Sequence, residues 1–155
     1  MRLFEIVAEP YNYSVEVRPE NVYGVKIQAV FTTKQHHEVS ARIAYNPETK
    51  SVGLGFTRNG QYELTGQGDQ FKILVTVVDF FKQYLPKMIS EYNPEVVYFS
   101  GDVNEKSRIK LYSKRGASIV GKILGSSWVG PTEKIWQDPK SGITDLNFIW
   151  NRKTA

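Results

Sequence analysis

The first 65 residues alternate between apolar and polar positions in short runs. The runs begin at Phe4, Tyr13, Val25, Val39 and Val52. A period of two is typical of strands with one buried face. Two turn sequences, Asn46–Thr49 and Arg58–Gly60, separate apolar runs, and Asn-Gly favours a tight hairpin. The amino-terminal part is therefore predicted to be an antiparallel meander.

From Phe71 onward the apolar residues recur at helical spacing as far as Leu85. They form a wide apolar face, which predicts a helix that packs deeply against the sheet. The narrow polar stripe opposite comprises Lys72, Thr76, Asp79, Gln83 and Lys87. Pro86 is expected to kink or end this helix, because proline lacks the backbone N–H and its ring crowds the preceding turn.

A further strand and a second helix follow. VVYFS (Val96–Ser100) is a nearly continuous apolar run, which is typical of a central strand covered on both faces. A helix is expected from near Glu105 to Leu124, with Gly125 ending it. Its expected buried residues are Ile109, Tyr112, Ile119 and Ile123.

The chain is predicted to end in two strands, around residues 133–136 and 143–150, after a loop at Trp128–Pro131. No internal repeat, low-complexity tract or linker interrupts the 155 residues, so we expect one domain. The predicted fold class is α+β, with two main helices packed on one largely antiparallel, twisted sheet. The predicted single domain covers residues 1–155, with antiparallel strands over 1–65 and a helix–strand–helix–hairpin over 66–155.

Composition narrows the class of protein. Hydrophobic residues make up 41% and charged residues 23% of the chain, as is ordinary for a globular domain. The absence of cysteine excludes disulfides, thiolate metal sites and a cysteine nucleophile, and it suits a reducing cytoplasm. The stretch MRLFEIVAEP is too short and too charged for a signal peptide, and no apolar run is long enough to span a bilayer. A cytoplasmic location without membrane contact is therefore expected.

Charge is distributed unevenly along the chain. Residues 101–155 carry ten lysines and arginines against five acidic residues, whereas residues 1–100 carry ten against eleven. Lys106, Lys110 and Lys114 recur every four residues and form one stripe on the second helix. This basic helix, residues 105–124, is either a solvated face or a site for an anion, such as a phosphate, a nucleic-acid backbone or a macromolecular partner. Nothing points to sequence-specific reading of nucleic acid.

Other candidate chemistry is sparse. His36 and His37 are adjacent, and adjacent residues of a strand point to opposite faces, so they are expected at the surface and not as a metal pair. No Ser-His-Asp pattern and no carboxylate pair at catalytic spacing is present. Trp128, Trp136 and Trp150 are expected in packing roles. No metal site is predicted.

Two motifs stand at the starts of the two helices. The hexad Glu63-Leu64-Thr65-Gly66-Gln67-Gly68 precedes the first helix, and Leu111-Tyr112-Ser113-Lys114-Arg115-Gly116 lies on the second. With the order of elements, they resemble the GNAT superfamily of acyl-CoA-dependent N-acyltransferases, over residues 50 to 150. The chain also resembles small GNAT-like proteins of tailed bacteriophages, which implies the host cytoplasm as its location.

The resemblance implies a coenzyme A or acetyl-CoA site. Gly66, Gln67 and Gly68 would hold the pyrophosphate at the helix start, where orphan N–H groups favour an anion. Tyr112 would protonate the leaving thiolate, and Lys106 or Lys110 would lie near the 3′-phosphate. The thioester arm would enter a V-shaped splay between the strand before Gly66 and the strand Val96–Ser100.

The chain also departs from the family pattern. Glu63 stands where the family has Gln or Arg, and it is the candidate for the base that takes the amine proton. Asp69 places a carboxylate beside the phosphate loop, and as a favoured cap it offers a purely structural explanation of the helix start. For Tyr112 a structural role, as a half-buried aromatic on an amphipathic helix, is favoured over the role of acid, because most of the nine tyrosines must be structural.

Residues 8–62 show no helical period where the family has two acceptor-wall helices. The favoured function is therefore a catalytically degenerate, phage-encoded GNAT-like protein that binds a host or phage macromolecule. The alternative is an acyl-CoA-dependent N-acetyltransferase that acts on an amine. The sequence alone gives neither the acceptor nor the oligomeric state.

Overall fold

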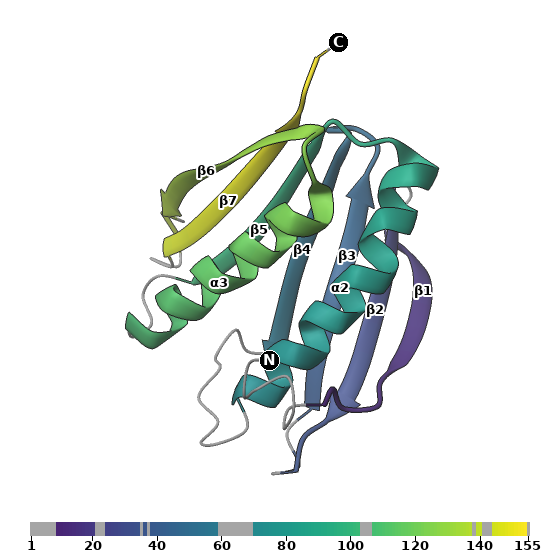
Figure 1. Ribbon diagram of the computed structural model, residues 1–155, viewed down its shortest axis with the longest axis vertical. Helices are drawn as coiled ribbons and strands as arrows, with labels where there is room; N and C mark the ends of the chain where they lie inside the picture. Colours follow the sequence, from purple (N-terminus) through teal and green to yellow (C-terminus); the bar gives the residue numbers. More distant parts are fainter. Residues whose placement is uncertain are drawn as a thin grey trace.

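The computed structural model describes residues 9–20, 24–34, 36, 38–58, 70–102, 107–137, 139–140 and 144–154. Seven strands and two long helices lie within these residues (Figure 1). The strands are β1 (Ser14–Glu20), β2 (Gly24–Thr32), β3 (Glu38–Asn46), β4 (Ser51–Arg58), β5 (Val96–Asp102), β6 (Trp128–Gln137) and β7 (Thr144–Arg152). The helices are α2 (Gln70–Tyr92) and α3 (Ser107–Leu124).

The strands form one seven-stranded sheet in the order β1-β2-β3-β4-β5-β7-β6. The first four strands are the predicted antiparallel meander, and β5, β7 and β6 are also joined in antiparallel fashion. Among the described strands, β4 and β5 are the only neighbours that pair in parallel, because α2 crosses between them. The predicted α+β class, a largely antiparallel sheet with two main helices, is confirmed.

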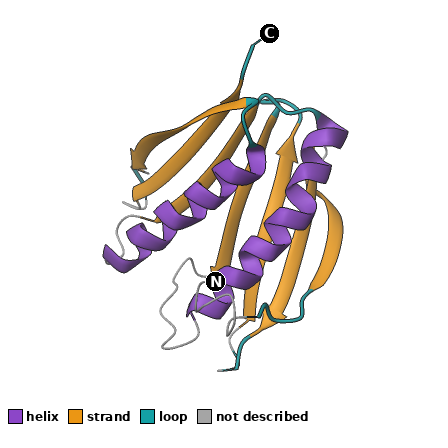
Figure 2. Ribbon diagram, viewed as in Figure 1, coloured by secondary structure: helices purple, strands orange, loops and turns teal. Residues whose placement is uncertain are grey.

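Both helices lie on the same face of the sheet (Figure 2). The core fills the space between them and the sheet, and its largest fully buried side chains include Phe80, Phe99, Phe148 and Trp150. Along β3 the residues that face the helices, Val39, Ala41 and Ile43, are fully buried. The alternation in the sequence therefore identified the buried face of the meander correctly.

Two predicted boundaries differ from the structure. Of the two alternatives predicted for Pro86, a kink or an end, the end is excluded, because α2 continues to Tyr92. The last turns are held by packing, since Met88 is buried and Tyr92 stacks on Tyr45 with ring centroids 4.8 Å apart. Residues 128–131 are not a loop but the start of β6, and a register shift between Val129 and Thr132 accommodates Pro131, which has no N–H for the ladder.

Two predictions of burial are only partly confirmed. β5 is central as expected, but Tyr98 on one of its faces is 38% exposed, whereas Phe99 on the other is buried. On α3 the described buried residues are Gly116, Ala117, Val120 and Leu124. Ile119 and Ile123 are half-buried, and Ile123 packs against the core. Gly125 ends α3 with a positive φ of 79°, as predicted.

The polar stripe of α2 is not solvated throughout. Thr76 is fully buried, because the segment before β1 lies against it. The backbone N–H of Tyr11 donates to Thr76 Oγ1 at 2.8 Å, and that hydroxyl donates to the carbonyl of Lys72 at 2.7 Å. The Lys72 ammonium lies 4.4 Å from the centroid of the Tyr11 ring. The expected strand Phe4–Ala8 and the turn residues Asn59 and Gly60 lie outside the described residues.

Candidate functional site

β4 and β5 are neighbours over only half of their lengths. Their parallel register covers four pairs, from Ser51 opposite Val96 to Leu54 opposite Phe99. Beyond these pairs β4 keeps its ladder to β3 as far as Arg58, and β5 keeps its ladder to β7 as far as Asp102. The two strands therefore part from each other while each remains in the sheet, and Figure 1 shows the divergence. The sheet has a V-shaped opening at the carboxyl ends of its one parallel pair.

The amino-terminal ends of both helices lie at this open end. α2 begins at Gln70 after β4, and α3 begins at Ser107 after β5, so each helix starts near the strand end that precedes it (Figure 1). The first N–H groups of a helix have no intrahelical partner, and the helix dipole adds positive potential there. In open sheets with parallel strands, ligands bind at such carboxyl ends, where neighbouring connections diverge.

An aromatic cluster closes the apex of the V on the helix side. Phe99 lies at its centre, with ring centroids 6.3 Å from Phe56, 6.5 Å from Phe81 and 6.4 Å from Phe148. Gly116 of α3 lies directly on Phe99, because a Cβ there would come within 3.2 Å of the ring. Phe56 is only half-buried. The cluster is therefore an apolar floor with one partly exposed ring, Phe56, at the start of the divergence.

On the opposite face of the sheet, side chains from the two strands that flank β4 lie over two of its glycines. A Cβ added at Gly53 would come within 2.5 Å of Tyr98 Cζ and Oη, so the phenol ring of Tyr98 lies across Gly53. A Cβ at Gly55 would lie 3.6 Å from Arg42 Nε, so the guanidinium of Arg42 lies over Gly55. A hydroxyl and a cation thus lie on the sheet surface beside the apex of the V.

Most of the site residues predicted from sequence fall outside what the structure describes. Glu63, Gly66, Gln67, Gly68 and Lys106 lie outside the described residues. Lys110 and Tyr112 belong to α3, but their side chains are not described. The structure therefore tests the framework of the predicted site, which is the divergence and the two helix starts, and leaves these residue assignments as predictions.

Sequence reasoning missed Tyr98, Arg42 and the pair Gly53 and Gly55. A signal was present in the run SVGLGF, because alternate glycines in a strand mark places where other groups approach the backbone closely. His36 is exposed, as expected, at a turn with φ of 63°, and His37 is outside the described residues. Trp128 and Trp150 are buried, as expected.

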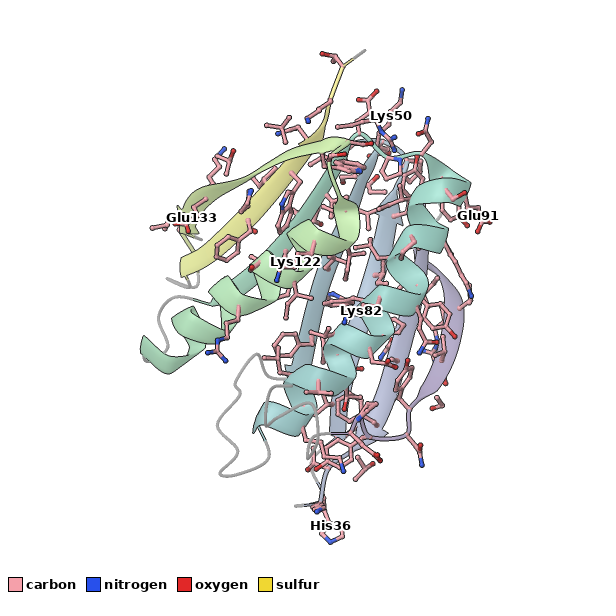
Figure 3. The ribbon with its side chains drawn as sticks, viewed as in Figure 1. His36, Lys50, Lys82, Glu91, Lys122 and Glu133 are labelled. Atoms are coloured by element: carbon pink, nitrogen blue, oxygen red, sulfur yellow. The ribbon has the colours of Figure 1, made fainter. Side chains whose placement is uncertain are left out.

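Among the residues that the structure describes, no three His, Asp or Glu side chains are grouped closely enough to hold a metal ion. Neither of the two described helices is both long and apolar enough to cross a membrane. On the helix side the exposed cations include Lys82 on α2 and Lys122 on α3 (Figure 3).

No family model and no curated protein matches the chain. Solved structures that are similar to it include two forms of one acetyltransferase. A point mutant of spermidine N-acetyltransferase SpeG from Vibrio cholerae aligns at a TM-score of 0.43 and 9% identity, over 86% of this chain and 68% of its own. A chimera of SpeG from Vibrio cholerae with hSSAT aligns at 0.40 and 8%, over 82% and 67%.

Proposed function

We propose that the chain is an acyl-CoA-dependent N-acyltransferase. The observation that carries the proposal is the divergence of β4 and β5 after four residue pairs, beside the amino-terminal ends of α2 and α3. Beyond the fourth pair, the facing edges of β4 and β5 no longer pair with each other. An extended arm with amide groups, such as that of coenzyme A, pairs with strand edges of this kind. Two helix starts at the same end suit its phosphates.

The predicted residues give the site its chemistry. Gly66, Gln67 and Gly68 would hold the pyrophosphate, and Lys106 or Lys110 would lie near the 3′-phosphate. Acyl-coenzyme A, when bound, would supply an activated acyl thioester. Glu63 is the candidate base that would take the proton of the acceptor amine, and Tyr112 is the candidate acid that would protonate the leaving thiolate sulfur. One base takes up a proton and one acid gives up a proton, so the proposed reaction balances.

A second candidate is a binding protein without catalysis. The observation in its favour is that the described part of residues 9–58 contains four strands and turns but no helix, so an acceptor wall of the expected kind is absent there. The basic helix 105–124 would then engage a host or phage macromolecule. The phage origin and the cytoplasmic location remain predictions of the sequence.

Calorimetry separates the two candidates. Coenzyme A and acetyl-CoA are titrated into the protein and into Gly68→Glu, which places a carboxylate and a side chain in the phosphate loop. We expect saturable micromolar binding that the substitution weakens at least tenfold. Gly121→Ala, near the far end of α3, is the control and should leave binding unchanged, because a Cβ there makes only an ordinary contact. No heat at millimolar ligand would refute the acyltransferase and favour the binding protein.

A further inference from the structure

The described sheet has two edge strands, β1 and β6, and β1 combines an apolar face with a charged one. β1 stands at one end of the strand order, and Figure 1 shows it along one side of the sheet. Its register with β2 places the positions of Val15, Val17 and Pro19 on the face that carries the helices, and Glu16 and Arg18 on the other face. Val17 is 67% exposed, more than any other large apolar side chain that the structure describes. An exposed edge strand of this kind is a template for pairing with another chain.

A second copy of β1 in antiparallel orientation fits this edge. When a strand pairs with its own copy about a two-fold axis, one residue faces itself, and residues equally far before and after it face each other. Pairing about Val17 places Glu16 of each copy opposite Arg18 of the other, and Val15 opposite Pro19. The charged residues then meet on one face of the joined sheet and the apolar residues on the other.

The charges of β1 select this register. Pairing about Glu16 would set two carboxylates opposite each other, and pairing about Arg18 would set two guanidinium groups opposite each other. Like charges directly opposite are destabilising in a sheet, whereas opposite charges are stabilising. Within one chain Arg18 Nη2 lies 2.6 Å from Glu16 Oε2, with side chains 62% and 47% exposed, and so exposed an ion pair contributes little by itself. Pairing about Val17 joins two such ion pairs into one network of four alternating charges.

The other edge strand, β6, fits a second copy less well. Its most exposed large apolar residue is Ile135, at 65%. Symmetric pairing about Glu133 or Lys134 would oppose like charges, and pairing about Ile135 would place no acidic residue opposite a basic one. Charge complementarity therefore favours β1 as the edge for self-association.

We propose that the protein forms a symmetric dimer in which two copies of β1 pair antiparallel about Val17. Val17 packs against its own copy on the face that carries the helices, and two Glu16–Arg18 pairs cross the seam on the other face. Pro19 has no N–H to donate, so the ladder is short and the dimer is weak and reversible. Two strands, β2 and β3, separate β1 from β4, so the V-shaped opening stays accessible in the dimer.

The test is sedimentation velocity over a series of protein concentrations, in the absence of coenzyme A. We expect the parent protein to pass from monomer to dimer as its concentration rises. Glu16→Arg and Arg18→Glu should each weaken dimerisation at least tenfold, because each sets like charges opposite each other across the seam. Lys82→Glu, an exposed charge reversal on α2, is the matched control for Arg18→Glu and should change dimerisation less than twofold.

Mixing the two charge-reversal variants separates charge pairing from loss of folding. In a one-to-one mixture, a copy of Glu16→Arg that meets a copy of Arg18→Glu has opposite charges at every cross-strand pair. We expect this mixture to regain the dimer that each variant alone has lost. The double variant Glu16→Arg/Arg18→Glu should also regain it, and circular dichroism checks that each variant is folded.

Any of three results overturns the proposal. One is a parent protein that stays monomeric throughout the concentration series. Another is a dimer that survives both charge reversals, and its loss in Ile135→Glu would then assign the interface to β6. The third is a pair of folded single variants that remain monomeric when mixed. Because coenzyme A is left out and β1 is no part of the V, none of these results depends on the acyltransferase proposal.

Discussion

At the scale of single residues, Tyr13 shows how one side chain fixes β1 to α2. Its hydroxyl donates to Asp79 Oδ2 at 2.7 Å, and Gln83 Nε2 donates to the same carboxylate at 2.8 Å and to the Tyr13 hydroxyl at 3.1 Å. The ring also packs edge-on against Phe80. Burial, and then the hydrogen bond to Asp79, raise the pKa of Tyr13 well above its usual value.

This raised pKa predicts a loss of stability in alkali. In the unfolded chain Tyr13 ionises near pH 10, whereas in the folded protein it keeps its proton to higher pH. Above pH 10 the folded state therefore binds more protons, and the free energy of unfolding falls as the pH rises. Below pH 10 this contribution is fully present.

Tyr13→Phe should lower the free energy of unfolding by about 1–2 kcal/mol at pH 7, because the two hydrogen bonds of the hydroxyl, with Asp79 and with Gln83, are lost while Gln83 still donates to Asp79. The variant should also lose stability less steeply between pH 10 and 11 than the parent protein. Urea unfolding at a series of pH values measures both effects. An equally steep fall in the variant would show that another group governs the alkaline transition.

At the scale of elements, α3 has two glycines that differ in what surrounds them. Gly121 has room, since a Cβ there would lie 3.5 Å from Trp150 Nε1, an ordinary contact. Gly116 has little room, since a Cβ would come within 3.2 Å of the buried Phe99 ring. The helix tolerates both glycines because its buried face, not its propensity, holds it to the sheet.

Gly121→Ala should therefore stabilise the protein by about 0.5–1 kcal/mol through helix propensity. Gly116→Ala offers the same gain in propensity but must displace the aromatic cluster, so we expect no gain or a net loss. Denaturant midpoints of the two variants give the comparison. A larger gain at Gly116 than at Gly121 would mean that the cluster around Phe99 is loosely packed.

The elements were largely predictable, because periods of two and of helical spacing report directly on the buried face. The errors have a physical cause in each case. Continued packing of Met88 and Tyr92 overrode the helix-breaking tendency of Pro86, and a bulge allowed Pro131 into β6. The motif residues 63–68 were predicted from a family pattern. The position of the Tyr98 ring over Gly53 could not be predicted, because it depends on the pairing of β4 with β5, which no local sequence pattern specifies.

At the scale of the whole molecule, the end opposite the V is tied together by Arg152. Its Nε donates to the carbonyl of Pro94 at 3.0 Å, and its guanidinium lies 4.8 Å from the ring centroid of Trp128. Its backbone N–H donates to the carbonyl of Glu95 at 2.9 Å. The end of β7 is thereby joined both to the connection before β5 and to the start of β6.

Arg152→Ala should lower the free energy of unfolding by about 1–3 kcal/mol, because it removes a hydrogen bond and a cation–aromatic contact together. Lys153→Ala, at the exposed next position, is the control and should stay within about 0.5 kcal/mol. Thermal unfolding measures both. Coenzyme A binding at the far end should be the same in both variants, and a change in Arg152→Ala alone would show that the two ends are coupled.

The short ladder between β4 and β5 also has a kinetic meaning. Each strand from β1 to β4 pairs with its neighbour in the sequence, whereas β5 reaches β4 only after the whole of α2 has been crossed. Closing that long excursion costs more chain entropy and is repaid by only four residue pairs. The meander should therefore assemble early. The ladder between β4 and β5 should form last, and its amide hydrogens should exchange first.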